Sequence, residues 1–195
     1  MTDWEQQYRE GTTPWNKGLP SPPMLDWVLK HKPVGRALVP GCGVGHDVAM
    51  LAEHGLDAHG LDIAPTAILM AEQTYPLLTG RFILADLFAP PADYTGSFDF
   101  IFEHTCLCAL PPEWRVRYEK AVHDLLKPGG LLVGVWFINP EMGADESGPP
   151  FGIEVPQLCA LFDESRWQIV EDLVPDVGYD GRVGRERLRV LRRSL

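Results

Sequence analysis

Short apolar runs alternate with helical patterns along most of this chain. Runs typical of buried strands occur at 36–40, 58–62, 81–86, 97–103 and 131–138. Apolar residues recur with helical spacing at 22–31, 47–54, 64–75 and 113–126. Strands that alternate with helices are typical of a parallel sheet covered by helices. The pattern therefore predicts an α/β fold.

The last part of the chain departs from this alternation. A short helix is expected at 155–162, followed by strands near 166–173 and 185–193. The link 176–184 is glycine-rich and hairpin-like, so the last strand is predicted to run antiparallel. The sum is a doubly wound, seven-stranded, mostly parallel sheet in a single domain spanning 1–195.

Residues 1–30 are predicted to form a helical arm outside the sheet. Thr2 and Glu5 have the spacing of a capping box, which places a short helix over 3–9. The arm carries three aromatic residues, Trp4, Tyr8 and Trp15. They are interpreted either as a lid that excludes water and faces a cation, or as an apolar staple onto the core.

Composition narrows the function classes. The chain has 195 residues, of which 45% are apolar, enough for one full core. Its formal net charge of −10 argues against a nucleic-acid partner. We expect neither a signal peptide nor a membrane span, which makes the cytoplasm the default compartment. No apolar helix face is left over, so a monomer is expected.

Two clusters of side chains leave alternatives open. The four cysteines include no CxxC pair, so we expect neither a disulfide framework nor a metal site. Six arginines gather in 182–193. They are interpreted either as an anion-binding face or as the charged surface of an edge strand.

The strongest local motif follows the first strand. It reads Gly41-Cys42-Gly43-Val44-Gly45-His46-Asp47. Glycines here let the backbone approach a ligand and direct the next helix toward it. The dinucleotide fingerprint requires glycine at the place of His46, so that pattern fails. A purely structural tight turn is the alternative.

Acidic residues end the second and third strands at the same edge of the sheet. Asp62 is suited to accept both hydroxyls of a ribose, in NAD or in S-adenosylmethionine alike. Asp86 and the following Leu87 are suited to the amino edge and the face of an adenine. The alternative for both acids is a helix cap or a turn.

Two residues at the end of the fourth strand are the candidates for acceptor chemistry. Glu103 could accept a proton or hold a cationic group, and His104 could hydrogen-bond the amino-acid end of a cofactor. The alternative is that both are ordinary strand-end residues.

The chain resembles the thiopurine S-methyltransferase family, particularly its halide and thiol methyltransferase branch. The resemblance rests on Trp4…Tyr8…Gly11-Thr12-Thr13-Pro14-Trp15, Pro40-Gly41-Cys42-Gly43-Val44-Gly45-His46-Asp47, Gly60-Leu61-Asp62-Ile63, Phe98-Asp99-Phe100-Ile101-Phe102-Glu103, Leu125-Leu126-Lys127-Pro128-Gly129-Gly130 and Gly148-Pro149-Pro150-Phe151. It implies a Rossmann-like class I methyltransferase that uses S-adenosylmethionine.

The resemblance also implies site residues. Cofactor contacts are implied at Trp4, Tyr8, Trp15, Gly41, Gly43, Asp62, Asp86, Leu87 and His104, and acceptor contacts at Glu103 and Phe151. The branch often has tryptophan at the place of Tyr8 and aspartate at Glu103, and thiopurine enzymes have arginine at His104. These departures leave the acceptor open among thiols, thiopurines, bisulfide and halides.

The implied chemistry is an in-line transfer of a methyl group to a small soft nucleophile. An anionic nucleophile requires no catalytic residue, whereas a neutral thiol would need Glu103 or His104 as its base. On that hypothesis Glu103→Gln lowers activity with neutral thiols and spares iodide. The rival interpretations are an NAD-dependent oxidoreductase and a non-catalytic S-adenosylmethionine-binding protein.

Overall fold

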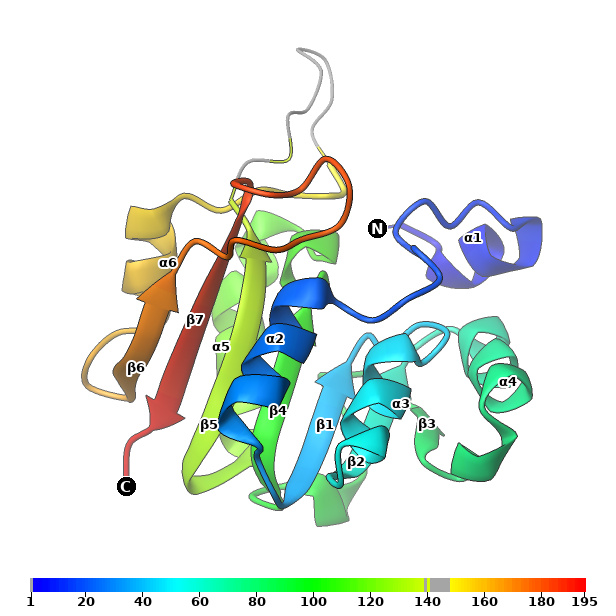
Figure 1. The fold of residues 1–195 in the computed structure, drawn as a ribbon, viewed down its shortest axis with the longest axis horizontal. Coiled ribbons are helices and arrows are strands. Elements are labelled where there is room, and N and C mark those ends of the chain that lie inside the picture. Colours follow the sequence, from blue (N-terminus) through cyan, green and yellow to red (C-terminus); the bar gives the residue numbers. More distant parts are fainter. Residues whose placement is uncertain (1, 139, 141–147) are drawn as a thin grey trace.

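The computed structural model describes residues 2–138, 140 and 148–195. Its seven strands form one sheet in the order β3-β2-β1-β4-β5-β7-β6 (Figure 1). The strands are β1 Arg36–Pro40, β2 Asp57–Asp62, β3 Phe82–Leu84, β4 Phe98–His104, β5 Leu126–Phe137, β6 Trp167–Leu173 and β7 Glu186–Arg193. The helices are α1 Trp4–Glu10, α2 Pro22–His31, α3 His46–Glu53, α4 Pro65–Thr74, α5 Arg115–Leu125 and α6 Val155–Leu161.

The direction of the strands is as predicted. β1 pairs in parallel with β2 and β4, and the same holds for β2 with β3 and for β4 with β5. β7 is antiparallel to both of its neighbours, β5 and β6. The predicted doubly wound α/β sheet is confirmed. Its strand order reverses between β1 and β4, which is where open α/β sheets bind ligands.

Helices cover both faces of the sheet. Figure 1 shows α2 and α3 in front of the sheet and α5 behind it. The front core is formed by residues such as Met24, Trp27 and Leu51, and the rear core by residues such as Tyr118 and Phe162. Among the described residues, no helix is long and apolar enough to cross a membrane.

Local details differ from the sequence prediction at three places. The cap of α1 is Asp3, whose carboxylate accepts the N–H of Gln6 at 3.0 Å, so Thr2 does not cap this helix. β5 begins at Leu126 rather than 131, because Leu126 pairs with Phe98 ahead of a register shift. β7 lies inside the sheet, so the edge-strand interpretation of its arginines is wrong.

Several of those arginines have structural partners. Asp172 on β6 accepts from Arg187 Nε at 2.5 Å and from Arg189 Nη2 at 2.6 Å. Arg189 is almost fully buried, and pairing offsets the cost of removing its charge from water. Arg187 and Arg189 hold β7 against β6 through Asp172. Arg182 and Arg185 lie in the link before β7.

Candidate active site

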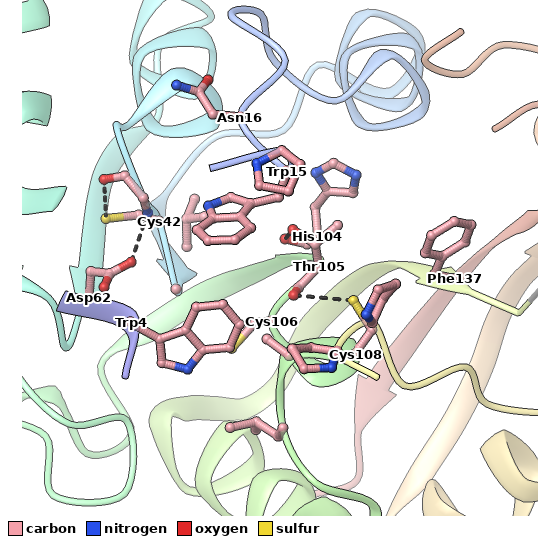
Figure 2. Close-up of a pocket in the computed structure, with 18 of the residues that line it drawn as sticks. Trp4, Trp15, Asn16, Cys42, Asp62, His104, Thr105, Cys106, Cys108 and Phe137 are labelled. Atoms are coloured by element: carbon pink, nitrogen blue, oxygen red, sulfur yellow. Dashed lines mark hydrogen bonds between the residues drawn. The ribbon is translucent and has the colours of Figure 1, made fainter. Parts of the chain in front are cut away.

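The carboxyl ends of the parallel strands, the N-terminal arm and the link between β6 and β7 surround one large pocket. Its volume is about 840 Å³, within the range of sites for small molecules and cofactors. Figure 2 shows Asp62 toward one end of it, His104 near the middle and Phe137 toward the other end. The pocket therefore runs across the sheet, over the point where the strand order reverses.

The loop after β1 has a backbone that requires glycine. Gly41, Gly43 and Gly45 have φ values of 60°, 54° and 84°, which residues other than glycine rarely adopt. A Cβ added to Gly43 would lie 2.8 Å from the Tyr8 hydroxyl, and one on Gly45 would lie 2.6 Å from the Phe82 ring. The loop is thus closely packed on both sides while Gly41 and Gly43 line the pocket.

Asp62 lines the pocket at the end of β2 and is 7% exposed. Its two oxygens accept the backbone N–H groups of Gly43 and Ala64, each at 2.9 Å. Burial raises the pKa of this carboxyl, and the two N–H groups act in the opposite direction by stabilising the anion. A carboxylate has about four acceptor positions, so further donors can still bind it.

Asp86 and Leu87 lie together in the pocket wall after β3. Asp86 Oδ1 accepts the N–H of Phe88 at 2.9 Å, which fixes a tight turn at this point. Leu87 is buried and belongs to the rear core. The turn interpretation of Asp86 is therefore correct, and it is compatible with a ligand contact.

The aromatic residues of the arm pack against one another over the glycine loop. Trp15 Nε1 donates to the Tyr8 hydroxyl at 3.0 Å, and Trp4 meets Trp15 edge to face at 5.3 Å. They pack on a small apolar cluster formed by Val44 and residues at the start of α4. All three aromatic residues also line the pocket. The packing expected of a staple is thus present, and the same rings form part of the pocket wall, so the lid interpretation stays a prediction.

Polar contacts anchor the arm. Glu5 accepts the N–H of Thr66 at 2.9 Å and its hydroxyl at 2.7 Å. This carboxylate caps α4, whose own cap residue Ala64 has no polar side chain. At the other end of the arm, the Tyr179 hydroxyl donates to the Leu19 carbonyl at 2.9 Å.

His104 lines the pocket between two carboxylates. Its Nδ1 lies 3.6 Å from Asp47 Oδ2, and its Nε2 lies 3.7 Å from Glu186 Oε1. Burial opposes the charged imidazolium, but the two carboxylates outweigh it and raise the pKa of His104 to about 9. His104 is therefore protonated at neutral pH. Its buried Nε2 has no hydrogen-bond partner among the described residues.

Glu103 lies outside the pocket, contrary to the expectation from the sequence. It is 1% exposed, and its carboxylate accepts the N–H groups of Cys106 and Leu107 and the hydroxyl of Tyr118. Neighbouring residues of a strand point to opposite faces, and here His104 lines the pocket while the Glu103 side chain points toward Tyr118 on α5. The assignment of Glu103 as an acceptor contact or a base is wrong.

Phe151 also lies outside the pocket wall. Its N–H donates to the Cys108 carbonyl at 2.7 Å, and its ring lies against Gly148. Pro149 and Pro150 of the same loop do line the pocket. The loop therefore reaches the site through its prolines, and the expected contact through Phe151 is wrong.

Other pocket residues were missed by the sequence analysis. They come from the loop after β1, the start of α3, the loop after β4, the end of β5 and the link before β7: Cys42, His46, Asp47, Cys106, Cys108, Phe137, Tyr179, Arg182 and Arg185. Burial raises the pKa of the Cys42, Cys106 and Cys108 thiols, so they stay protonated and weakly nucleophilic. The alternation of side chains along β4 was the signal that could have separated Glu103 from His104.

The family model for thiopurine S-methyltransferase (TPMT) matches residues 1–180 of this chain. The chain belongs to the thiopurine S-methyltransferase family. Within this family, it is 32% identical over 191 residues to probable thiol methyltransferase 2 of Arabidopsis thaliana, which covers 95% of this chain and 82% of that protein. It is 37% identical over 158 residues to thiocyanate methyltransferase 1 of the same plant, with 78% and 67% covered.

The fold is shared with solved methyltransferases. The structure of Burkholderia thailandensis 1,6-didemethyltoxoflavin-N1-methyltransferase, with its substrate and S-adenosylhomocysteine bound, aligns with a TM-score of 0.74 at 20% identity, over 99% of this chain and 86% of that one. This thiopurine S-methyltransferase family member is thus an S-adenosylmethionine-dependent methyltransferase, as the sequence predicted. The alternatives of an NAD-dependent oxidoreductase and a non-catalytic binding protein are set aside.

Proposed function

We propose that this methyltransferase acts on a small, soft nucleophile that arrives as an anion, such as a thiolate, and that no protein side chain removes a proton from it. The observation that carries the proposal is the state of the groups in the pocket that could act as a base. Among the described residues, each of these groups either has hydrogen-bond or ion-pair partners or is exposed to solvent.

The engaged groups lie along the whole pocket. His46 Nδ1 contacts the Tyr75 hydroxyl at 2.6 Å, and its Nε2 contacts Asn16 Oδ1 at 3.1 Å. Asp47 accepts the N–H of Ser21 at 2.7 Å and faces the His104 imidazolium. Asp62 and Asp86 accept backbone N–H groups, and Asp180 is exposed at the rim.

The protonated state of His104 completes this argument. A base must begin in its deprotonated form, and a histidine with a pKa of about 9 does not do so at neutral pH. Glu103, the other candidate, has no access to the pocket. The acceptor must therefore enter the pocket already deprotonated.

The half of the pocket between Asp62 and His104, here called the cofactor half, fits S-adenosylmethionine. Asp62 has remaining acceptor positions for the two ribose hydroxyls, beside a loop at Gly43 that has no room for a side chain. The unpartnered Nε2 of His104 is suited to donate to the carboxylate of the methionine end. Asp86 and Leu87 are suited to the adenine, at the far end from His104.

S-adenosylmethionine supplies a methyl group on a cationic sulfur. The chain contributes position and exclusion of water: holding the acceptor in line behind the methyl can be worth on the order of 7–11 kcal/mol. Trp4, Tyr8 and Trp15 close the pocket with apolar surface, and aromatic faces attract a cation. A dry pocket favours a reaction in which an anion and a cation become neutral.

The relatives support the class of acceptor. Two of them are named as thiol and thiocyanate methyltransferases. Thiolate and thiocyanate are soft sulfur anions that need no base, in agreement with a pocket whose candidate bases are already engaged.

Transfer of a labelled methyl group from S-adenosylmethionine to a panel of acceptors tests the proposal. We expect transfer to thiols, thiocyanate or iodide, and little to alcohols or to alkyl amines, which are protonated at neutral pH; both of these need a base. Asp62→Asn is expected to weaken binding of S-adenosylhomocysteine about tenfold or more, because the ribose contacts lose a charged partner. A preference for amines or alcohols over every soft anion would overturn the proposal.

A further inference from the structure

Two arginines line the end of the pocket that the cofactor contacts leave free. Arg182 and Arg185 both belong to the link between β6 and β7, which Figure 1 shows at the same edge of the sheet as the arm. Their guanidinium carbons lie 4.6 Å and 5.4 Å from the centre of the Phe137 ring. Two cationic groups therefore converge on one aromatic side chain inside the pocket.

This cationic end adjoins His104 through Glu186, whose Oε1 lies 3.7 Å from His104 Nε2 and accepts from Arg182 Nη1 at 3.0 Å, and it extends away from Asp62. β7 begins two strands beyond β4, and neighbouring strands are about 4.8 Å apart, so its start lies about 10 Å from the end of β4. Figure 2 shows Asp62 and Phe137 on opposite sides of His104. A group bound beside Phe137 would therefore lie on the far side of His104 from Asp62.

The carboxylates near the two arginines differ in exposure: Glu186 is buried and Asp180 is exposed. Arg182 Nη1 donates to Glu186 Oε1 at 3.0 Å, and Glu186 is buried and also faces His104. Arg185 Nη1 donates to the Gly181 carbonyl at 2.9 Å. Asp180 is exposed at the rim. Since a guanidinium has five N–H donors in a planar fork, Arg182 can bind a further anion while keeping its contact to Glu186.

We propose that Arg182 and Arg185 bind a carboxylate carried by the acceptor, so that the preferred substrate is a small thiol with a carboxylate a few bonds from its sulfur. Guanidinium groups match carboxylates with paired hydrogen bonds, and the Phe137 ring provides an apolar surface for the short chain between the two ends. The inference rests on the proposed function and adds to it a class of acceptor.

The test compares mercaptopropionate with its methyl ester, which has the same thiol and no charge. The wild-type enzyme is expected to prefer the carboxylate in kcat/KM by about tenfold or more, the effect of a hydrogen bond to a charged group. Arg182→Gln and Arg185→Gln should each bring this ratio toward one. Arg192→Gln, exposed on β7 and outside the pocket wall, is the matched control and should keep the wild-type ratio.

Three outcomes would overturn the inference. The first is a ratio near one in the wild-type enzyme, and the second is a ratio that both arginine variants leave unchanged. The third is an equal loss of the iodide and mercaptopropionate rates in these variants, because the arginines would then act on the nucleophile itself. Absence of transfer to every soft acceptor, with S-adenosylhomocysteine still bound, would instead overturn the proposed function, and this inference with it.

Discussion

At the scale of single residues, two acids at strand ends have opposite roles. Asp62 and Glu103 look equivalent in the sequence, since each closes a buried strand. Asp62 faces the pocket and keeps free acceptor positions, whereas Glu103 faces the rear core and accepts three hydrogen bonds. The difference comes from the direction of the side chain, which alternates along a strand.

Glu103 is therefore expected to be a structural residue that fixes the loop carrying Cys106 and Cys108. Glu103→Leu leaves two backbone N–H groups and the Tyr118 hydroxyl without their acceptor and should lower the free energy of unfolding by about 2–4 kcal/mol. Glu103→Gln, which keeps one acceptor oxygen, should lower it less. Chemical denaturation measures both.

The same variants test the choice between a structural residue and a base. The rates with iodide and with a neutral thiol should change together in Glu103→Gln. A selective loss with the thiol would restore Glu103 as a base and contradict its position in the structure.

At the scale of elements, the arm has a defined anchor beside the pocket, and we propose that it acts as a lid. The contact between Glu5 and Thr66 joins α1 to the start of α4. This anchor positions the aromatic residues of the arm, which pack on the same part of α4. Because the same residues line the pocket, the position of α1 and the closure of the cofactor site are linked.

Weakening the anchor should weaken cofactor binding. Glu5→Gln and Thr66→Val are each expected to raise the Kd of S-adenosylhomocysteine several-fold, and the double variant should raise it by less than the product of the two effects, because both changes weaken the same pair of hydrogen bonds. Glu10→Gln, on the exposed end of the same helix, is the control. Fully additive effects on the Kd, measured by calorimetry, would show that the two residues act separately.

The extent of the sequence prediction also differs by element. The α/β sheet, its antiparallel last strand and the places of Gly41, Gly43 and Asp62 in the pocket wall could be predicted, because apolar periodicity and strand ends are local signals. The pocket wall formed by Phe137, Arg182 and Arg185 could not be predicted, because these residues come from segments that only the folded sheet brings together. Phe151 was misplaced because its loop has no periodic pattern that fixes the direction of a side chain.

At the scale of the whole molecule, His104 is a buried junction. Asp47 comes from α3, Glu186 from β7 and His104 from β4, and Asp47 also accepts the N–H of Ser21 before α2. One imidazolium thus joins both helical and strand elements around the pocket. Arg182 stands behind Glu186 and adds a second cation to this network.

This junction makes stability depend on pH. The pKa of His104 is raised from 6.5 to about 9, so its stabilising charge is fully present below pH 6.5 and is lost as the pH rises through 9. The loss in the free energy of unfolding is on the order of 3 kcal/mol. His104→Gln should not show this loss, whereas the exposed His54→Gln should retain it. A parallel decline in His104→Gln and wild type would contradict the assignment.

The most direct measurement for the whole account is the pH dependence of kcat/KM with two thiols of different acidity, thiophenol and mercaptoethanol, at pH values well below the His104 pKa of about 9, where this residue stays protonated. With no base in the protein, the rate should level off near the pKa of each thiol itself: early for thiophenol, whereas the mercaptoethanol rate continues to rise across the range. A break at the same pH for both thiols would reveal a titrating side chain in the pocket and contradict the central claim.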